Sequence, residues 1–204
     1  FGITLDKSSG TWKVASAKWP GLHKTHALQG PIDDAFLNPF LIVKPTGKPW
    51  NAAVHEQAMR ILSRFDRLYA KNYRAHPRMK DDRDVTAADF ANYNVILFGD
   101  PGSNAWISKV MAKLPLTWSQ TEIKMAGQSY AAANHLPALA YPSPLSATRY
   151  VVLNSGLTID EREYNADYSL PRWGDFAILK VSRDAELPDV AKAGLFDELW
   201  RTPR

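Results

Sequence analysis

Polar residues that could bind a ligand or take part in catalysis are concentrated in three short turns, at residues 30–36, 99–104 and 154–156. The second and third turns directly follow apolar runs that have the composition of buried strands. In an open α/β sheet, ligands bind in the crevice outside the carboxyl ends of parallel strands, so these turns could meet there. The candidate ligand-binding residues are Asp34, Asp100, Ser103, Asn104, Asn154 and Ser155.

The turn at residues 99–104 has the sequence Gly-Asp-Pro-Gly-Ser-Asn. Its glycines permit a tight bend, and Ser103 or Asn104 can cap the next helix, whose free N–H groups could then bind an anion. The simpler interpretation, which we favour, is a strand-to-helix turn in which Asn104 is the cap and Asp100 accepts backbone hydrogen bonds. The turn lacks the lysine and the spacing of a Walker loop, and it is not a Gly-x-Gly-x-x-Gly motif.

The other two turns have equally simple interpretations. Ser155 could be a nucleophile, but a nucleophile elbow needs Gly-x-Ser-x-Gly and a sharp turn into a helix, which residues 157–159 do not begin. Asp33 and Asp34 could bind a hard cation or act as acid and base if further ligands converged on them. Adjacent side chains usually point apart, so we expect at most one of them to face a site and Asp34 to cap a short helical turn.

Metal and thiol chemistry have little support in the composition. The chain has five histidines and no cysteine, which excludes disulfides and thiolate metal sites. No His-Glu-x-x-His helix and no acidic partner at zinc spacing accompanies the histidines, so we predict neither a metal nor a cofactor. A Ser-His-Asp triad assembled from distant segments stays open, because proximity in space need not follow sequence order.

Length and charge limit the classes of partner. A chain of 204 residues is long enough for one domain with a sizeable core. The net charge of +4 is modest, and basic and acidic residues alternate at residues 78–84, so we predict no nucleic-acid partner. No apolar run approaches the roughly 20 residues of a membrane span. Residues 1–6 have the pattern of a strand interior, so we expect the sequence to be part of a longer protein.

Hydrophobic spacing predicts one long helix and several shorter elements. Val54, Ala58, Ile61 and Phe65 recur at helical spacing and predict a helix over residues 51–73. Further apolar patterns predict strands at residues 40–43, 95–98, 136–141, 150–153 and 176–181, a helix over 105–113, hairpins around 8–10 and within 122–133, and a short helix or extended packing arm at 193–200.

The order of these elements predicts the fold class. Strands that alternate with helices are typical of an open α/β sheet with right-handed crossovers, and continuous apolar strands indicate burial on both faces. We therefore predict an open, mostly parallel sheet flanked by helices in three layers, Rossmann-like or flavodoxin-like, with N-terminal and middle β-hairpins. We expect one domain over residues 1–204, with an entry hairpin and loop at 1–38 and an α/β core at 39–204.

The sequence also resembles a region of known proteins. The similar blocks, in the same order along the chain, are residues 28–36, 40–47, 94–104, 150–158, 170–181 and 194–200. They resemble the region after the catalytic domain of large bacterial prolyl-oligopeptidase-like hydrolases, which are multidomain, mostly exported α/β-hydrolase proteins described as peptidases or esterases. The nucleophilic serine of that family lies in a Gly-x-Ser-x-Gly elbow, which this sequence lacks, so no catalytic residue is carried over.

The resemblance implies a non-catalytic C-terminal companion domain of a secreted or periplasmic hydrolase. Its partner would be the upstream α/β-hydrolase domain of the same polypeptide, and the substrate would be a peptide or a carbohydrate ester. Two alternatives remain. The chain could itself be a hydrolase or small-ligand binder that uses the polar turns, or it could be a carbohydrate-binding module. The aromatic residues that would form a carbohydrate platform are Trp12, Trp19, Trp50, Trp118 and Trp173.

Overall fold

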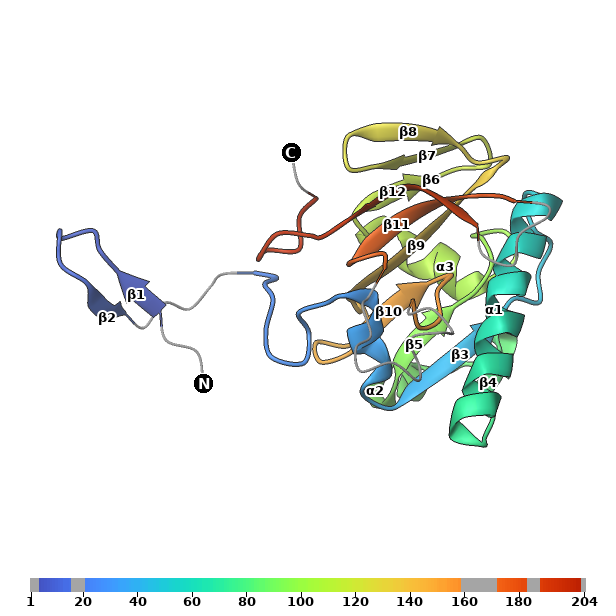
Figure 1. Ribbon diagram of the computed structural model, residues 1–204, viewed down its shortest axis with the longest axis horizontal. Helices are drawn as coiled ribbons and strands as arrows, with labels where there is room; N and C mark the ends of the chain where they lie inside the picture. Colours follow the sequence, from blue (N-terminus) through green and yellow to red (C-terminus); the bar gives the residue numbers. More distant parts are fainter. Residues whose placement is uncertain (1–3, 16–20, 159–171, 183–187, 203–204) are drawn as a thin grey trace.

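The computed structural model describes residues 4–15, 21–158, 172–182 and 188–202. Its main feature is a seven-stranded sheet, shown in Figure 1. In spatial order the strands are β12 (Asp189–Gly194), β11 (Phe176–Lys180), β9 (His135–Pro142), β10 (Tyr150–Leu153), β5 (Asn94–Leu97), β3 (Phe40–Lys44) and β4 (Met79–Asp81).

The sheet is mixed, and this corrects the predicted fold class. β4, β3, β5 and β10 run parallel, whereas β9 is antiparallel to both β10 and β11, and β12 is antiparallel to β11. Residues 143–149 connect β9 to β10 and are too few for the crossover that parallel neighbours need. Of the described residues, 31% lie in strands and 26% in helices, so the structure is mostly β. The predicted three-layer, mostly parallel α/β fold is therefore wrong.

Three α-helices occur in the described residues: α1 (Ala52–Tyr73), α2 (Ala87–Asn92) and α3 (Ala105–Val110). The apolar stripe predicted for the long helix is confirmed, since Val54, Ala58, Ile61 and Phe65 of α1 are all buried. Figure 1 shows α1 in front of the sheet and α3 behind it. None of the helices in the described ranges has both the length and the apolar character needed to cross a membrane.

Short 3-10 helices complete the helical elements: η1 (Ile32–Phe36), η2 (Asp82–Asp84) and η3 (Met111–Lys113). η1 packs close to α1, where the rings of Phe36 and Phe65 meet edge to face with centroids 5.2 Å apart. Ile32 and Ala35 of η1 are fully buried in the same core as the central strands. The segment before β3 thus contributes to the core.

Two smaller sheets lie outside the main one. β1 (Thr4–Asp6) and β2 (Lys13–Ala15) form an antiparallel hairpin that stands apart from the seven-stranded sheet in Figure 1. β6 (Leu116–Trp118), β7 (Glu122–Met125) and β8 (Gln128–Ala131) form an antiparallel meander. Both predicted hairpins are therefore confirmed, and Gly127 adopts the positive φ of 74° that the β7–β8 turn needs.

The chain after β12 is an extended packing arm, the second of the two forms expected for it. Phe196 and Trp200 are buried, and the ring of Trp200 meets those of Tyr141 and Tyr150 with centroids 5.6 and 6.1 Å apart. Aromatic rings in edge-to-face contact add to the stabilisation from their burial. The arm therefore covers the end of the sheet at which β10 begins and β9 finishes.

Candidate functional site

Four of the candidate residues meet where β5 and β10 end: Asp100, Ser103, Asn104 and Asn154. All four are buried. Asn154 has a φ of 46°, and its Oδ1 accepts a hydrogen bond from the Gly99 backbone N–H at 2.8 Å. Its Nδ2 donates to the carbonyl oxygens of Gly99 at 3.0 Å and Pro137 at 3.2 Å. The Asn154 side chain thus connects the backbones beside three strands, β5, β10 and β9.

The Asp100 carboxylate is committed to backbone groups. Its Oδ1 accepts hydrogen bonds from the N–H groups of Gly102 at 2.9 Å and Ser103 at 2.8 Å, and its Oδ2 accepts one from Trp50 at 2.8 Å. The Ser103 Oγ in turn accepts a hydrogen bond from the Asp100 N–H at 2.9 Å. This is the structural role that we favoured for Asp100, and it also connects the turn to the start of α1.

The side chains of Asn104 and Ser155 are also hydrogen-bonded to backbone groups. Asn104 caps α3, accepting from the N–H groups of Trp106 at 3.0 Å and Ile107 at 3.4 Å, and it donates to the Phe98 carbonyl oxygen at 2.9 Å. The Ser155 Oγ donates to the Gly156 carbonyl oxygen at 2.8 Å and is buried. The turns do converge, but their polar groups hold the backbone in place.

Asp34 lies elsewhere, and the expectation that it caps a helical turn is wrong: the N-cap of η1 is Pro31, and no side chain caps it. Asp34 belongs to η1, and its Oδ2 accepts a 2.7 Å hydrogen bond from the hydroxyl of Tyr150, the first residue of β10. The candidates of the other turns follow the opposite ends of the strands. Burial, together with the nearby Asp34, raises the pKa of the Tyr150 hydroxyl far above its usual range. Asp34 is therefore paired with a neutral phenol and does not join the other candidates.

Asp33 points away from its neighbour, as expected for adjacent side chains. Its oxygens accept hydrogen bonds from the Thr158 backbone N–H at 2.7 Å and the Thr158 hydroxyl at 2.5 Å. Burial raises the pKa of this carboxyl group, and the hydrogen bonds from Thr158 oppose the shift. Asp33 thus connects η1 to the segment that follows β10. Within the described ranges, no group of three or more His, Cys, Asp or Glu side chains could hold a metal.

Lys24 and Asp175 form a buried ion pair that no sequence pattern indicated. Asp175 is fully buried just before β11, and its Oδ2 accepts hydrogen bonds from Lys24 Nζ at 2.8 Å and the Phe196 N–H at 2.8 Å. Lys24 Nζ also lies 5.1 Å from the centre of the Trp200 ring. Burial raises the pKa of the Asp175 carboxyl group, and Lys24 opposes that shift. The pair connects the segment before η1 and the C-terminal arm to the sheet.

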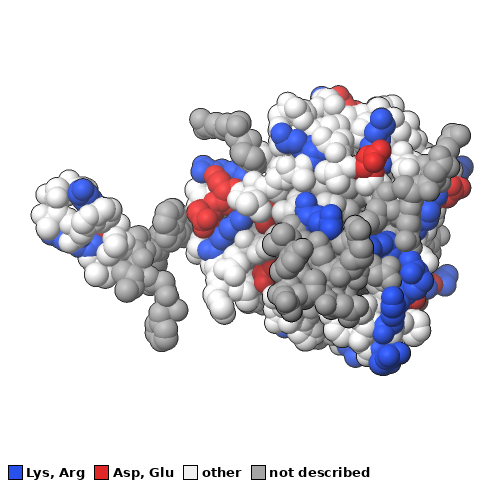
Figure 2. All heavy atoms as spheres, in the orientation of Figure 1, with Lys and Arg blue, Asp and Glu red and all other residues white. Residues whose placement is uncertain are grey.

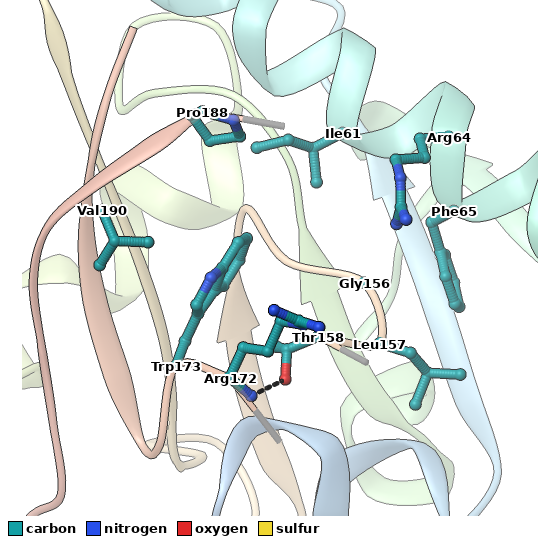
Figure 3. Close-up of a pocket in the computed structure, with 10 residues that line it drawn as sticks. All are labelled: Ile61, Arg64, Phe65, Gly156, Leu157, Thr158, Arg172, Trp173, Pro188 and Val190. Carbon is teal, nitrogen blue, oxygen red and sulfur yellow. Dashed lines mark hydrogen bonds between the residues drawn. The ribbon is translucent and has the colours of Figure 1, made fainter. Parts of the chain in front are cut away.

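A cavity beside the chain that follows Ser155 has a volume of about 310 Å³ (Figure 3). It lies between α1, the chain after β10 and the residues that lead into β11 and β12. Its lining residues are Ile61, Arg64, Phe65, Gly156, Leu157, Thr158, Arg172, Trp173, Pro188 and Val190. Of these, Trp173 was a candidate, for the carbohydrate platform. The cavity forms from four segments that are far apart in the sequence, so no local pattern indicates it.

The tryptophans proposed for a carbohydrate platform do not share one exposed surface. Trp12 is exposed, Trp50 is half-buried, and Trp118 and Trp173 are buried, while Trp19 lies outside the described residues. Trp50 and Trp118 instead pack edge to face with ring centroids 6.4 Å apart.

No family model, curated protein or solved structure matches this chain. Any function assigned to the chain therefore depends on its own sequence and structure.

Proposed function

We propose that the chain is a non-catalytic C-terminal companion domain of a secreted or periplasmic bacterial α/β hydrolase, a peptidase or an esterase. Its role would be to pack on the catalytic domain and to shape the substrate cleft. The resemblance of its sequence blocks suggests this partner. The observation that best supports it is the apolar face of the N-terminal hairpin.

This hairpin face consists of Leu5, Trp12 and Val14. Leu5 and Val14 are directly opposite each other in the β1–β2 pair, and Trp12 precedes Val14 by two residues, so strand alternation places all three on one side. Their exposed fractions are 56%, 62% and 77%. A two-stranded hairpin is at best marginally stable alone in water, and contiguous exposed apolar residues mark interaction sites. A hydrolase domain seated on this face would cover them.

The polar turns support the non-catalytic part of the proposal. A catalytic serine needs an accessible hydroxyl beside a general base. The Oγ atoms of Ser103 and Ser155 are buried and bonded to backbone groups. Figure 2 shows basic side chains spread over the visible face among acidic ones, with a denser row along the edge where α1 lies.

The proposed hydrolase partner and the hairpin face together give a direct prediction. The coding sequence upstream of Phe1 should encode a domain with a Gly-x-Ser-x-Gly elbow, and that domain should bind the 204-residue chain when each is produced separately. The double change Trp12→Ser and Val14→Thr should weaken the binding measured by calorimetry about tenfold or more, since burying such side chains contributes roughly 1.5–3 kcal/mol each.

The matched control is Leu37→Ser, which changes a side chain that is 79% exposed but lies outside the hairpin. It should leave the dissociation constant unchanged. An upstream sequence without the elbow would refute the hydrolase partner. Equal binding by the hairpin variant and the unaltered chain would refute the docking surface.

A further inference from the structure

We propose that the cavity beside α1 is a binding site for a small organic carboxylate with an apolar, preferably aromatic, body. This inference does not depend on the hydrolase partner. The cavity volume of about 310 Å³ is at the lower end of the range of small-molecule sites, which bury most of their ligand against apolar side chains and orient it with a few polar groups. Its lining has both components.

The cationic part consists of Arg64 and Arg172. Arg64 comes from the middle of α1 and is only 9% exposed, whereas Arg172 directly precedes Trp173 and is exposed. Figure 3 shows both guanidinium groups directed into the cavity from different sides. No acidic residue is among the described residues that line it. Arg64 and Arg172 are thus the charged side chains among the described lining residues.

Both arginines also interact with other groups of the protein. A guanidinium group has five N–H donors in a planar fork, so it can bind more than one partner at a time. Charge-assisted bonds from such a fork to a carboxylate are roughly twice as strong as neutral hydrogen bonds. Two guanidinium groups directed into one cavity are thus suited to bind the carboxylate end of a ligand.

The apolar part consists of Ile61, Trp173 and Val190. Figure 3 places the Trp173 ring along one side of the cavity, with Val190 to its left and Ile61 above. An indole offers a large flat surface to an aromatic or branched hydrocarbon group. These walls offer nothing to inorganic phosphate, which is polar on all sides, and they therefore favour a carboxylate attached to a hydrocarbon body.

Backbone contacts keep the two parts in place. The Thr158 Oγ1 accepts a 2.9 Å hydrogen bond from the Arg172 N–H and donates to Asp33, which connects the arginine to η1. A Cβ atom on Gly156 would lie 2.5 Å from Cγ of Phe65, so the floor of the cavity packs directly on α1. A preformed site of this kind lowers the cost of ordering on binding.

The test is calorimetric titration of the 204-residue chain with 3-phenylpropionate, with its neutral amide and with inorganic phosphate. We expect the acid alone to bind, with a dissociation constant below about 1 mM. Arg172→Gln should weaken this binding about tenfold, as expected for the loss of one charge-assisted hydrogen bond. Arg83→Gln removes an equal charge at an exposed site beside Asp81 and should change nothing.

The indole N–H signals in an NMR spectrum show where the ligand binds. The indole N–H signal that disappears in Trp173→Phe should be the one that shifts when the acid is added to the unaltered chain. Equal binding of acid and amide, equal binding by Arg172→Gln with an unchanged melting temperature, or preference for phosphate would each overturn the carboxylate site. So would the absence of binding at about 10 mM acid.

Discussion

Gly30→Ala should lower the free energy of unfolding by about 3–5 kcal/mol, which combines a steric clash with backbone strain. A Cβ atom on Gly30 would overlap Oδ1 of the buried Asp175, and the φ of Gly30 is 74°, in the left-handed region. Because Asp175 holds Lys24 and the Phe196 backbone, its displacement would disturb the anchor of the C-terminal arm. Urea unfolding followed by circular dichroism measures the effect.

Gly127→Ala is the matched control for this change. Gly127 has the same φ of 74°, but no atom lies within 4 Å of the position where its Cβ would be. This variant should therefore cost only the strain of a left-handed alanine, about 1–2 kcal/mol. Equal destabilisation by the two substitutions would mean that Gly30 is not in close contact with Asp175.

Asn154→Ala should have a similarly large effect, a loss of about 3–5 kcal/mol. The change removes three side-chain hydrogen bonds and leaves buried backbone groups of Gly99 and Pro137 without partners. It also forces an alanine to adopt a φ of 46°. The measurement is again the free energy of unfolding in urea.

Asn154→Gly separates the two contributions to this loss. Glycine accepts the left-handed φ without strain but restores none of the hydrogen bonds. It should therefore recover only about 1 kcal/mol relative to alanine, so that most of the destabilisation remains. Recovery of nearly full stability by the glycine variant would show that Asn154 is selected for its backbone conformation and not for its hydrogen bonds.

Local features were well predicted from the sequence, because nearest neighbours determine them. The long helix over residues 51–73 and the role of Asn104 as a cap follow from side-chain spacing and from the chemistry of one turn. The strand at residues 150–153 has the bounds of β10. The commitment of Asp100 to backbone amides follows in the same way.

The fold class was wrong because an apolar strand does not reveal its direction. β9 and β10 are both buried through most of their length, and such runs read alike in parallel and antiparallel surroundings. The short connection at residues 143–149 was the available signal against a crossover. β4 and β12 are edge strands with half-buried or exposed residues, so neither shows a continuous apolar run.

The site was only partly predictable. The turns of Asp100 and Asn154 meet because both follow strands that are parallel neighbours, which the general rule for open sheets anticipates. The Lys24–Asp175 pair joins residues 151 positions apart, and no local motif marks it. Arg64 and Arg172 come together only when α1 packs against the chain before β11. No pattern in the sequence therefore indicated the cavity.

We propose that the polar turns hold the backbone in place and do not catalyse. The most direct test of this proposal is ester and peptide hydrolysis by the purified 204-residue chain, compared with Ser103→Ala and Ser155→Ala, using 4-nitrophenyl acetate and a peptide nitroanilide. We predict no turnover above the buffer rate in any of the three preparations. Turnover by the unaltered chain that disappears in Ser155→Ala or Ser103→Ala, with an unchanged melting temperature, would contradict this account.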